Sequence, residues 1–287
     1  MDHIDIKARA KVNLALDVLG RRPDGYHNVR MVMQSIDLYD EVRVVSTDGD
    51  IRLYCDDKSL PLDENNLAYR AAMLLKERFN VRRGADIHIR KNIPVAAGLA
   101  GGSSDGAAVL KALNELWGIG LSGQKLMELG LALGADVPYC ILGGTALAEG
   151  IGEVLTPLPD LPKTWMVLVK PEIDISTKWV YTHLDLDKLT DRPDIDAMVK
   201  AVEDRDIRAV AENLSNVLES VSARRYPVIE AIKNGLTGMG ALGSVMSGSG
   251  PTVFGIFKDR AAAQRAARVL AMEYGHVYVT STYNDRV

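Results

Sequence analysis

The sequence predicts an α+β protein of two domains, and three observations support this. Strand-like runs crowd the first 54 residues, and the later helix-like and strand-like stretches do not alternate as in a regular βαβ fold. The chain of 287 residues is 47% hydrophobic, which suffices for a substantial core. Pro157, Pro159 and Pro162 fall close together, and this breaker cluster places the expected boundary between domains at residues 1–158 and 159–287.

The first domain is expected to begin with strands and to continue with helices. Runs rich in Val, Ile and Leu, separated by turn signals, predict strands at 4–6, 12–19, 29–36, 42–45, 51–54 and 87–89. Hydrophobic spacing predicts helices at 67–79, 104–117 and 125–134. Asn65 or Asn66 is a candidate N-cap for the first helix, and Ser122 for the third. A glycine-interrupted strand is expected over 141–155.

The second domain is expected to mix the two kinds of element. Apolar runs predict strands at 165–171, 252–257 and 276–282, the second of them directly after a glycine-rich turn. Helices are expected at 176–184, 196–219, 227–234 and 260–274.

Composition excludes several classes of protein. The net charge of −4 argues against nonspecific nucleic-acid binding. Two distant cysteines, Cys55 and Cys140, make a disulfide framework improbable and favour a reducing compartment, with Cys140 packed in an apolar run. The polar N-terminus resembles no signal peptide, and no apolar run is long enough to span a bilayer. We therefore expect a cytoplasmic protein without nucleic-acid or membrane partners.

The most informative segment is PVAAGLAGGSSDGAAVL, residues 94–110. Its glycines allow a ligand to approach the backbone closely, and a helix beginning near Ser103 would point free N–H groups and its positive dipole end at the loop. Such a helix start binds phosphate. The spacing fits neither a Walker A loop, since no Lys follows the last glycine, nor a Rossmann fingerprint. A flexible turn before a helix is the alternative, and the serines, the preceding proline and the following helix favour phosphate binding.

Four other features have a functional and a structural interpretation. Lys11 and Asn13 lie in an apolar strand, where Lys11 could instead protect a sheet edge. Asp136 has small and apolar neighbours and needs a partner if buried, but it could be solvated at a helix end. The turn 24–27 carries Tyr and His, and the segment 247–252 is either a tight turn or a second phosphate contact.

Together these features resemble the GHMP kinases, the small-molecule kinases named for galactose, homoserine, mevalonate and phosphomevalonate. The matching motifs are a Lys-bearing N-terminal strand, the PxxxGLxxxSS loop and the C-terminal SGSGPTVF, and the DGYH turn narrows the match to one branch of the family. The resemblance spans nearly the whole chain and is carried by residues 10–29, 93–105, 133–139 and 246–254. It implies a first half similar to the second domain of ribosomal protein S5 and a ferredoxin-like second half.

The resemblance also implies an enzyme whose two substrates meet in a cleft. ATP would phosphorylate the C2 hydroxyl of a sugar alcohol that carries cytidine diphosphate, in non-mevalonate isoprenoid precursor synthesis. Lys11 and Asp136 would be catalytic. The ATP-binding residues would be Asn66, Pro94, Val95, Ala96, Ala97, Gly98, Leu99, Ala100, Gly101, Gly102, Ser103 and Ser104. The acceptor would contact Asn13, Tyr26, His27, Thr177, Tyr181, Gly248 and Ser249.

Several points stay open in this resemblance. Tyr26 and His27 would read cytosine, and either Tyr181 or Trp179 would supply a second ring. Some relatives carry a glutamate soon after the serine pair as a Mg²⁺ ligand, but here no Glu precedes Glu115, so Ser104 and the ATP phosphates are the candidate contacts. The protein would be a monomer or a homodimer.

Two rival functions belong beside this one. A kinase of the same fold with a small acceptor would have no use for the DGYH turn. A nucleotide sensor without catalysis would have no use for Lys11 and Asp136. A dehydrogenase is disfavoured by the glycine spacing.

Overall fold

The computed structural model describes residues 2–284, so residue 1 and residues 285–287 at the ends of the two expected domains lie outside the described part. The first sheet has seven strands in the order β3-β4-β2-β1-β8, with β5 paired to β2 and β6 paired to β5. These strands are β1 (His3–Arg21), β2 (His27–Asp48), β3 (Ile51–Cys55), β4 (Arg83–Arg90), β5 (Thr145–Gly150), β6 (Val154–Pro157) and β8 (Ser215–Asn216).

Strands β1 and β2 are longer than the sequence suggested. They pair antiparallel from His3 opposite Val45 to Arg21 opposite His27, with register shifts that keep the ladder running. The expected breaks inside each strand are wrong, because charged residues such as Lys7 and Arg9 alternate with buried Ala8 and Ala10 rather than ending the strand.

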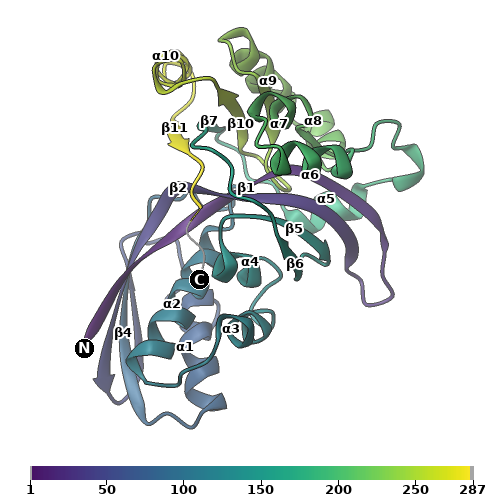
Figure 1. The fold of residues 1–287 in the computed structure, drawn as a ribbon. Coiled ribbons are helices and arrows are strands. Elements are labelled where there is room, and N and C mark those ends of the chain that lie inside the picture. Colours follow the sequence, from purple (N-terminus) through teal and green to yellow (C-terminus); the bar gives the residue numbers. More distant parts are fainter. Residues whose placement is uncertain (1, 285–287) are drawn as a thin grey trace.

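Helices cover one face of this sheet, as Figure 1 shows for α1 (Leu67–Arg78) and α2 (Gly101–Leu116). Apolar side chains of β2, β3 and β4 share one buried cluster with those of α1 and α2. Asn66 is the N-cap of α1, and Ser122 caps α3 (Gly123–Gly130) as expected, but α3 ends earlier than the sequence indicated. The expected strand over 141–155 begins instead in a further helix, α4 (Val137–Leu142).

The second sheet is antiparallel, in the order β11-β7-β10-β9. Its strands are β7 (Trp165–Lys170), β9 (Gly243–Met246), β10 (Val253–Phe257) and β11 (His276–Ser281). Helices α9 (Val228–Gly238) and α10 (Arg260–Leu270) pack on one face in a cluster with Val167, Val169 and Phe257. This layer matches the expected ferredoxin-like arrangement (Figure 1).

The other face of the second sheet packs toward the first sheet. Leu168, Phe254 and Ile256 share a buried cluster with Val12 and Leu14 of β1. Strand β8 also crosses between the halves, because it follows β7 in the chain but pairs with β1. The two halves thus share a common core and are packed against each other.

The expected single helix over 196–219 is wrong. The chain forms α6 (Ile195–Glu203), α7 (Ile207–Glu212), β8 and α8 (Glu219–Arg225). Arg205 has a φ of 55° and Asp206 caps α7, so the helix stops and restarts at this pair. The remaining helices are α5 (Thr177–His183) and the 3₁₀ turn η1 (Leu186–Lys188). In the described chain, no helix is both long and apolar enough to cross a membrane.

Both cysteines are free thiols. Cys140 is half-buried and packs against the cores of both halves, and burial raises the pKa of its thiol to about 12. This agrees with the packing role expected for Cys140.

Candidate active site

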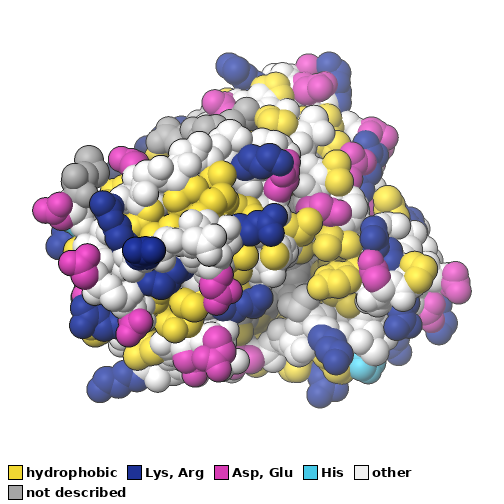
Figure 2. Space-filling model, turned by 90° about the horizontal axis from the view of Figure 1, so that it is seen from below, with side chains coloured by type: hydrophobic (Ala, Val, Ile, Leu, Met, Phe, Trp, Pro, Cys, Tyr) yellow, Lys and Arg dark blue, Asp and Glu magenta, His cyan; other side chains and the backbone are white. Residues whose placement is uncertain are grey.

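One large cleft gathers nearly all the residues that the sequence singled out. Its volume is about 1670 Å³, more than the roughly 300–1,000 Å³ typical of a pocket for one ligand, and Figure 2 shows the hollow from below. Every predicted site residue lines it except Ser104. The cleft therefore has room for two ligands.

The segment between β4 and α2 forms a nest, a backbone concavity of the kind that binds anions. Every second residue has a positive φ: Ala96 at 52°, Gly98 at 74° and Ala100 at 59°. Such alternation turns successive backbone N–H groups toward one concavity. Helix α2 then begins at Gly101, somewhat earlier than expected, and within the described chain no side chain caps it. The free N–H groups of its first turn and its dipole add to the positive field.

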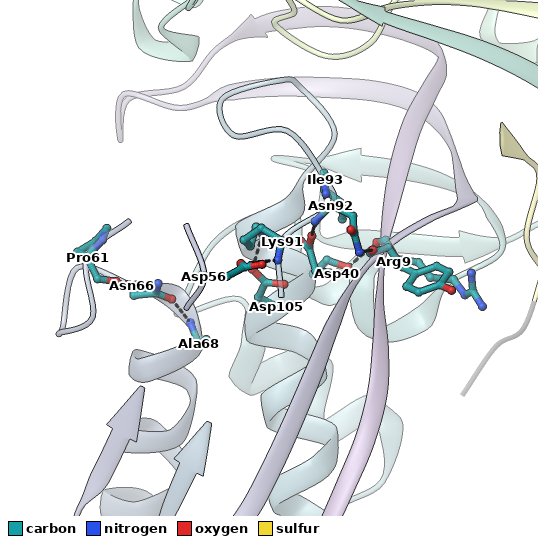
Figure 3. Close-up of polar contacts among 12 residues, drawn as sticks. Arg9, Asp40, Asp56, Pro61, Asn66, Ala68, Lys91, Asn92, Ile93 and Asp105 are labelled. Carbon is teal, nitrogen blue, oxygen red and sulfur yellow. Dashed lines mark hydrogen bonds and ion pairs between the residues drawn. The ribbon is translucent and has the colours of Figure 1, made fainter. Parts of the chain in front are cut away.

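A buried ion cluster fixes both ends of this loop, and the sequence analysis missed it. Lys91, at the end of β4, pairs with Asp40 at 2.5 Å and with Asp105 of α2 at 2.7 Å (Figure 3). Asp40 also accepts hydrogen bonds from the backbone N–H groups of Asn92 and Ile93. The signal available in the sequence was a lysine and an aspartate, Lys91 and Asp105, one at each end of the glycine-rich loop.

Asp105 has an oxygen left for a ligand. Burial raises the pKa of Asp105 to about 7, although Lys91 opposes this shift. Its Oδ1 atom is buried and has no hydrogen-bond partner among residues 2–284, and Asp105 lines the cleft. A buried acceptor without a partner is unfavourable, so a bound molecule that donates a hydrogen bond here would remove that penalty.

Lys11 and Asp136 meet beside the nest. Lys11 lies in β1 and is only 4% exposed, so the interpretation of Lys11 as a solvent-facing lysine that protects a sheet edge is wrong. Its buried Nζ atom is 2.8 Å from Oδ1 of Asn13 and 3.8 Å from Oδ2 of Asp136. The Lys11 backbone N–H donates to the Leu99 carbonyl, which ties β1 to the nest.

Asp136 stands at the start of α4 without capping it. Within the described part of the chain its carboxylate makes no cap hydrogen bond, and its side chain is 35% exposed where it lines the cleft. This carboxylate is therefore available to a hydroxyl group in the cleft.

Two aromatic rings pack together in the wall of the cleft. The rings of His27 and Tyr181 lie 5.1 Å apart at 37°. Burial raises the pKa of Tyr181, and the charge of Asp136 adds to the shift. Burial also lowers the pKa of His27, with a smaller contribution from Arg21, so that ring is kept neutral near pH 7. Tyr26 is 57% exposed at the rim, and the ring packed on Tyr181 is that of His27 rather than Tyr26.

The choice between Tyr181 and Trp179 follows from their contacts. Tyr181 lines the cleft, whereas Trp179 stacks on His183 at 4.4 Å and lies under the guanidinium of Arg225. Trp179 does not line the cleft, so of the two rings only that of Tyr181 is placed to meet a ligand there.

The remaining predicted residues divide into contacts and supports. Thr177 and Ser249 join by hydroxyls 2.8 Å apart, next to Gly248. Ser104 does not line the cleft, because its hydroxyl donates to the Arg9 carbonyl; the structure thus gives no support to Ser104 as a nucleotide or metal contact. Asn66 lines the cleft, but its side chain caps α1 at Ala68 and donates to the Pro61 carbonyl (Figure 3).

A backbone nest beside an ammonium–carboxylate pair, in a cleft with room for two ligands, suits a small-molecule kinase. Comparison with known proteins agrees. The family model "GHMP kinases N terminal domain" matches residues 66–144, and "GHMP kinases C terminal" matches residues 198–276. The chain therefore belongs to the GHMP kinase family, with the α+β fold expected from the sequence.

Individual relatives place it within the family. The chain is 49% identical over 287 residues to a 4-diphosphocytidyl-2-C-methyl-D-erythritol kinase of Alkaliphilus metalliredigens, covering 100% of this chain and 99% of the relative. It is 52% identical over 286 residues to the kinase of that name from Alkaliphilus oremlandii, covering 99% and 98%. A crystal structure of a 4-(cytidine 5'-diphospho)-2C-methyl-D-erythritol kinase superposes with a TM-score of 0.83 at 34% identity, covering 98% of this chain and 100% of that one.

Proposed function

We propose that this kinase transfers the γ-phosphoryl group of ATP to the C2 hydroxyl of 4-diphosphocytidyl-2-C-methyl-D-erythritol, a step of non-mevalonate isoprenoid precursor synthesis. The observation that carries the proposal is that one cleft holds three parts together: the nest, the Lys11–Asp136 pair and the His27–Tyr181 pair. The names of the relatives point to the same acceptor.

The residues of the cleft suit an in-line transfer. Phosphoryl transfer depends mainly on positioning and on charge stabilisation. Backbone N–H groups of the nest would hold the ATP phosphates. Asp136 would accept the proton of the attacking hydroxyl while the hydroxyl oxygen bonds to the γ-phosphorus and the bond from that phosphorus to ADP breaks. Lys11 would hold Asp136 and offset the charge on the transferring group.

ATP would bring Mg²⁺ into the cleft. This ion keeps several waters and usually binds through one or two carboxylates and the substrate phosphates. Over residues 2–284 no three His, Cys, Asp or Glu side chains cluster as a metal site, whereas Asp136 faces the cleft near the nest. The donor set thus fits an ion held mainly by phosphates, and such an ion neutralises phosphate charge when bound.

The acceptor would place its cytosine at the His27–Tyr181 pair. Stacking on an aromatic ring is worth about 1–3 kcal/mol per base but tolerates any base. Tyr181 would supply the stacking face, and the neutral ring of His27 can hydrogen-bond to the base edge. Asn13, Thr177 and Ser249 also line the cleft, and the sugar alcohol would lie among them.

Three further expectations accompany the proposal. We place the domain boundary between residues 158 and 159, after β6 ends at Pro157. We place the protein in the cytoplasm, which suits its two free thiols. A monomer or a homodimer suits a cleft that one chain lines.

The test is ADP release with ATP and 4-diphosphocytidyl-2-C-methyl-D-erythritol, with mevalonate as the control acceptor. We expect turnover with the cytidylyl acceptor alone, and competitive inhibition by CMP against that acceptor but not against ATP. Turnover with mevalonate and no effect of CMP would favour a kinase with a small acceptor. ATP binding without any turnover would favour a nucleotide sensor.

A further inference from the structure

The turn between β9 and β10 touches the nest backbone to backbone. A Cβ atom at Gly98 would lie 2.3 Å from the Ser247 carbonyl oxygen, and one at Gly248 would lie 3.3 Å from the Gly98 carbonyl oxygen. Gly98 and Gly248 both have a positive φ, at 74° and 56°. Glycine at both positions lets the two loops meet at this distance.

The hydroxyl of Ser247 joins three segments at this contact. It donates to the Gly98 carbonyl at 3.0 Å and accepts from the Asn13 backbone N–H at 3.3 Å. Ser247 is fully buried. The turn thus connects the nest to the part of β1 that carries Lys11 and Asn13.

Asn216 holds this turn from behind. Its Nδ2 atom donates to the carbonyls of Met246 at 2.7 Å and Gly248 at 2.8 Å, one on each side of Ser247. Its Oδ1 atom accepts from the Leu218 N–H at 3.0 Å. Asn216 is 7% exposed and sits opposite Leu16 of β1, so its anchor is the same strand that carries Lys11.

We propose that Asn216 is a positioning residue that acts through Ser247 to set the distance between the phosphate-binding nest and the acceptor. Asn216 does not line the cleft, so it touches neither ligand. The turn that it holds continues into Ser249, whose hydroxyl reaches Thr177 on the acceptor side. The inference rests on the proposed function for its kinetic readout alone, because the linkage between the loops is measurable without any substrate.

The sharpest variant is Asn216→Asp. It keeps the shape of the side chain and the Oδ1 acceptor but replaces the Nδ2 donor with a second oxygen. That oxygen faces the carbonyl oxygens of Met246 and Gly248, and the repulsion between acceptors pushes the turn away. A displacement of about 1 Å near reacting groups can cost roughly 100-fold in rate. We expect kcat to fall by about 10- to 100-fold while the KM for ATP changes by less than about threefold, since the hydrogen bonds of Asn216 go to the turn and to Leu218 and none goes to the nest.

Asn213→Asp is the matched control. Like Asn216, Asn213 donates its Nδ2 to a backbone carbonyl, that of Ala209 at 2.8 Å, and does not line the cleft. Unlike Asn216, it stands at the end of α7. We expect it to lower the melting temperature with kcat within twofold of wild type. A purely structural role for Asn216 would make the two variants alike.

Ser247→Ala tests the route of the effect. If Asn216 acts through this hydroxyl, the double variant loses no more kcat than the worse single variant, because residues in one chain of contacts are not additive. Ser244→Ala is the control, since its hydroxyl donates to the Phe254 carbonyl within the second sheet. Additive losses would overturn the proposed route.

Amide hydrogen exchange gives a readout that does not depend on the acceptor. In Asn216→Asp, exchange should speed up at the amides that join the segments, those of Asn13 (to Ser247 Oγ) and Lys11 (to the Leu99 carbonyl), as well as at Ser247 and Gly250 within the turn. In Asn213→Asp it should change at none of them. Unchanged exchange at Asn13 and Lys11 overturns the inference whatever the activity. A wild-type enzyme that fails to phosphorylate the cytidylyl acceptor would instead count against the proposed function and leave the exchange result to decide the linkage.

Discussion

Gly98→Ala should lower turnover far more than a glycine-to-alanine change at a position with the same backbone strain and no close contact. The new Cβ would lie 2.3 Å from the Ser247 carbonyl oxygen, whereas ordinary contacts begin at 3.4 Å. Neither partner is a flexible side-chain end, so the two loops must separate by about 1 Å, which is enough to cost roughly 100-fold in kcat. The φ of 74° adds a backbone penalty of about 1 kcal/mol, because alanine is disfavoured in the left-handed region.

Gly118→Ala isolates that backbone penalty. Gly118 follows α2 with a φ of 67°, a Cβ there would meet no atom within 4 Å, and the residue does not line the cleft. Both variants should lose about 1 kcal/mol of unfolding free energy from the strained φ, and Gly98→Ala should lose about 1–3 kcal/mol more from the clash with the Ser247 carbonyl. Only Gly98→Ala should lose turnover with the cytidylyl acceptor, by about 100-fold.

The assay is steady-state ADP release at saturating substrates, alongside urea denaturation of both variants. If Gly98→Ala keeps kcat within threefold of Gly118→Ala, the contact between the loops does not set the reacting geometry. Equal loss of kcat in both variants would show that backbone strain, rather than the contact, controls activity.

Three other predictions follow from the same cleft. Asp136→Asn should keep ATP binding, measured by calorimetry, and lower kcat by roughly 10²- to 10⁴-fold because the proton acceptor is lost; near-full activity would remove Asp136 from the mechanism. Tyr181→Ala should raise the KM for the cytidylyl acceptor about 10-fold or more with little change for ATP, whereas Trp179→Ala should affect neither, and equal effects of the two would contradict the assignment. Burial raises the pKa of Asp105 from 3.8 to about 7, so its contribution to stability is complete below pH 4 and is lost as pH rises toward 7. Asn cannot titrate, and the melting temperature of Asp105→Asn relative to wild type should therefore rise between pH 5 and pH 8; a constant difference would show that Lys91 keeps Asp105 ionised throughout.

The sequence could locate the glycine-rich loop and the helix after it, because glycines and a helix start leave a local signal. It could not predict that Ala96 and Ala100 adopt a positive φ, since alanine carries no preference for that conformation. The tertiary contacts at Gly98 are what fix the shape of the nest there. Local pattern thus located the loop, and packing decided its geometry.

The Lys11–Asp136 pair shows a different limit. Nothing in the spacing of the two residues brings them together, and the resemblance to a family supplied the pairing. In the structure, β1 and the start of α4 bring their side chains to 3.8 Å. Lys91 and Asp105 lie closer in sequence, yet their roles went unnoticed because a lysine at a strand end is an ordinary surface feature.

The predicted breaks inside the long strands are wrong because a charged residue need not end a strand. Lys7 and Arg9 interrupt the hydrophobic run of β1 but alternate outward along a continuous strand. In the second half, helical spacing continued through 196–219 although Arg205 and Asp206 stop and restart the helix. A short cap signal of this kind is weaker than the periodicity on either side of it.

The most direct test of the central claim is ³¹P NMR of wild-type protein incubated with ATP, Mg²⁺ and 4-diphosphocytidyl-2-C-methyl-D-erythritol. The account predicts one new phosphomonoester signal that grows as ATP becomes ADP while the acceptor's own diphosphate signals persist. Because C2 bears a methyl group and no hydrogen, this signal should show no splitting by a carbinol proton, unlike a phosphate on C1 or C3. Conversion of ATP to ADP and inorganic phosphate without that new signal, or phosphorylation at a different hydroxyl, would contradict the account.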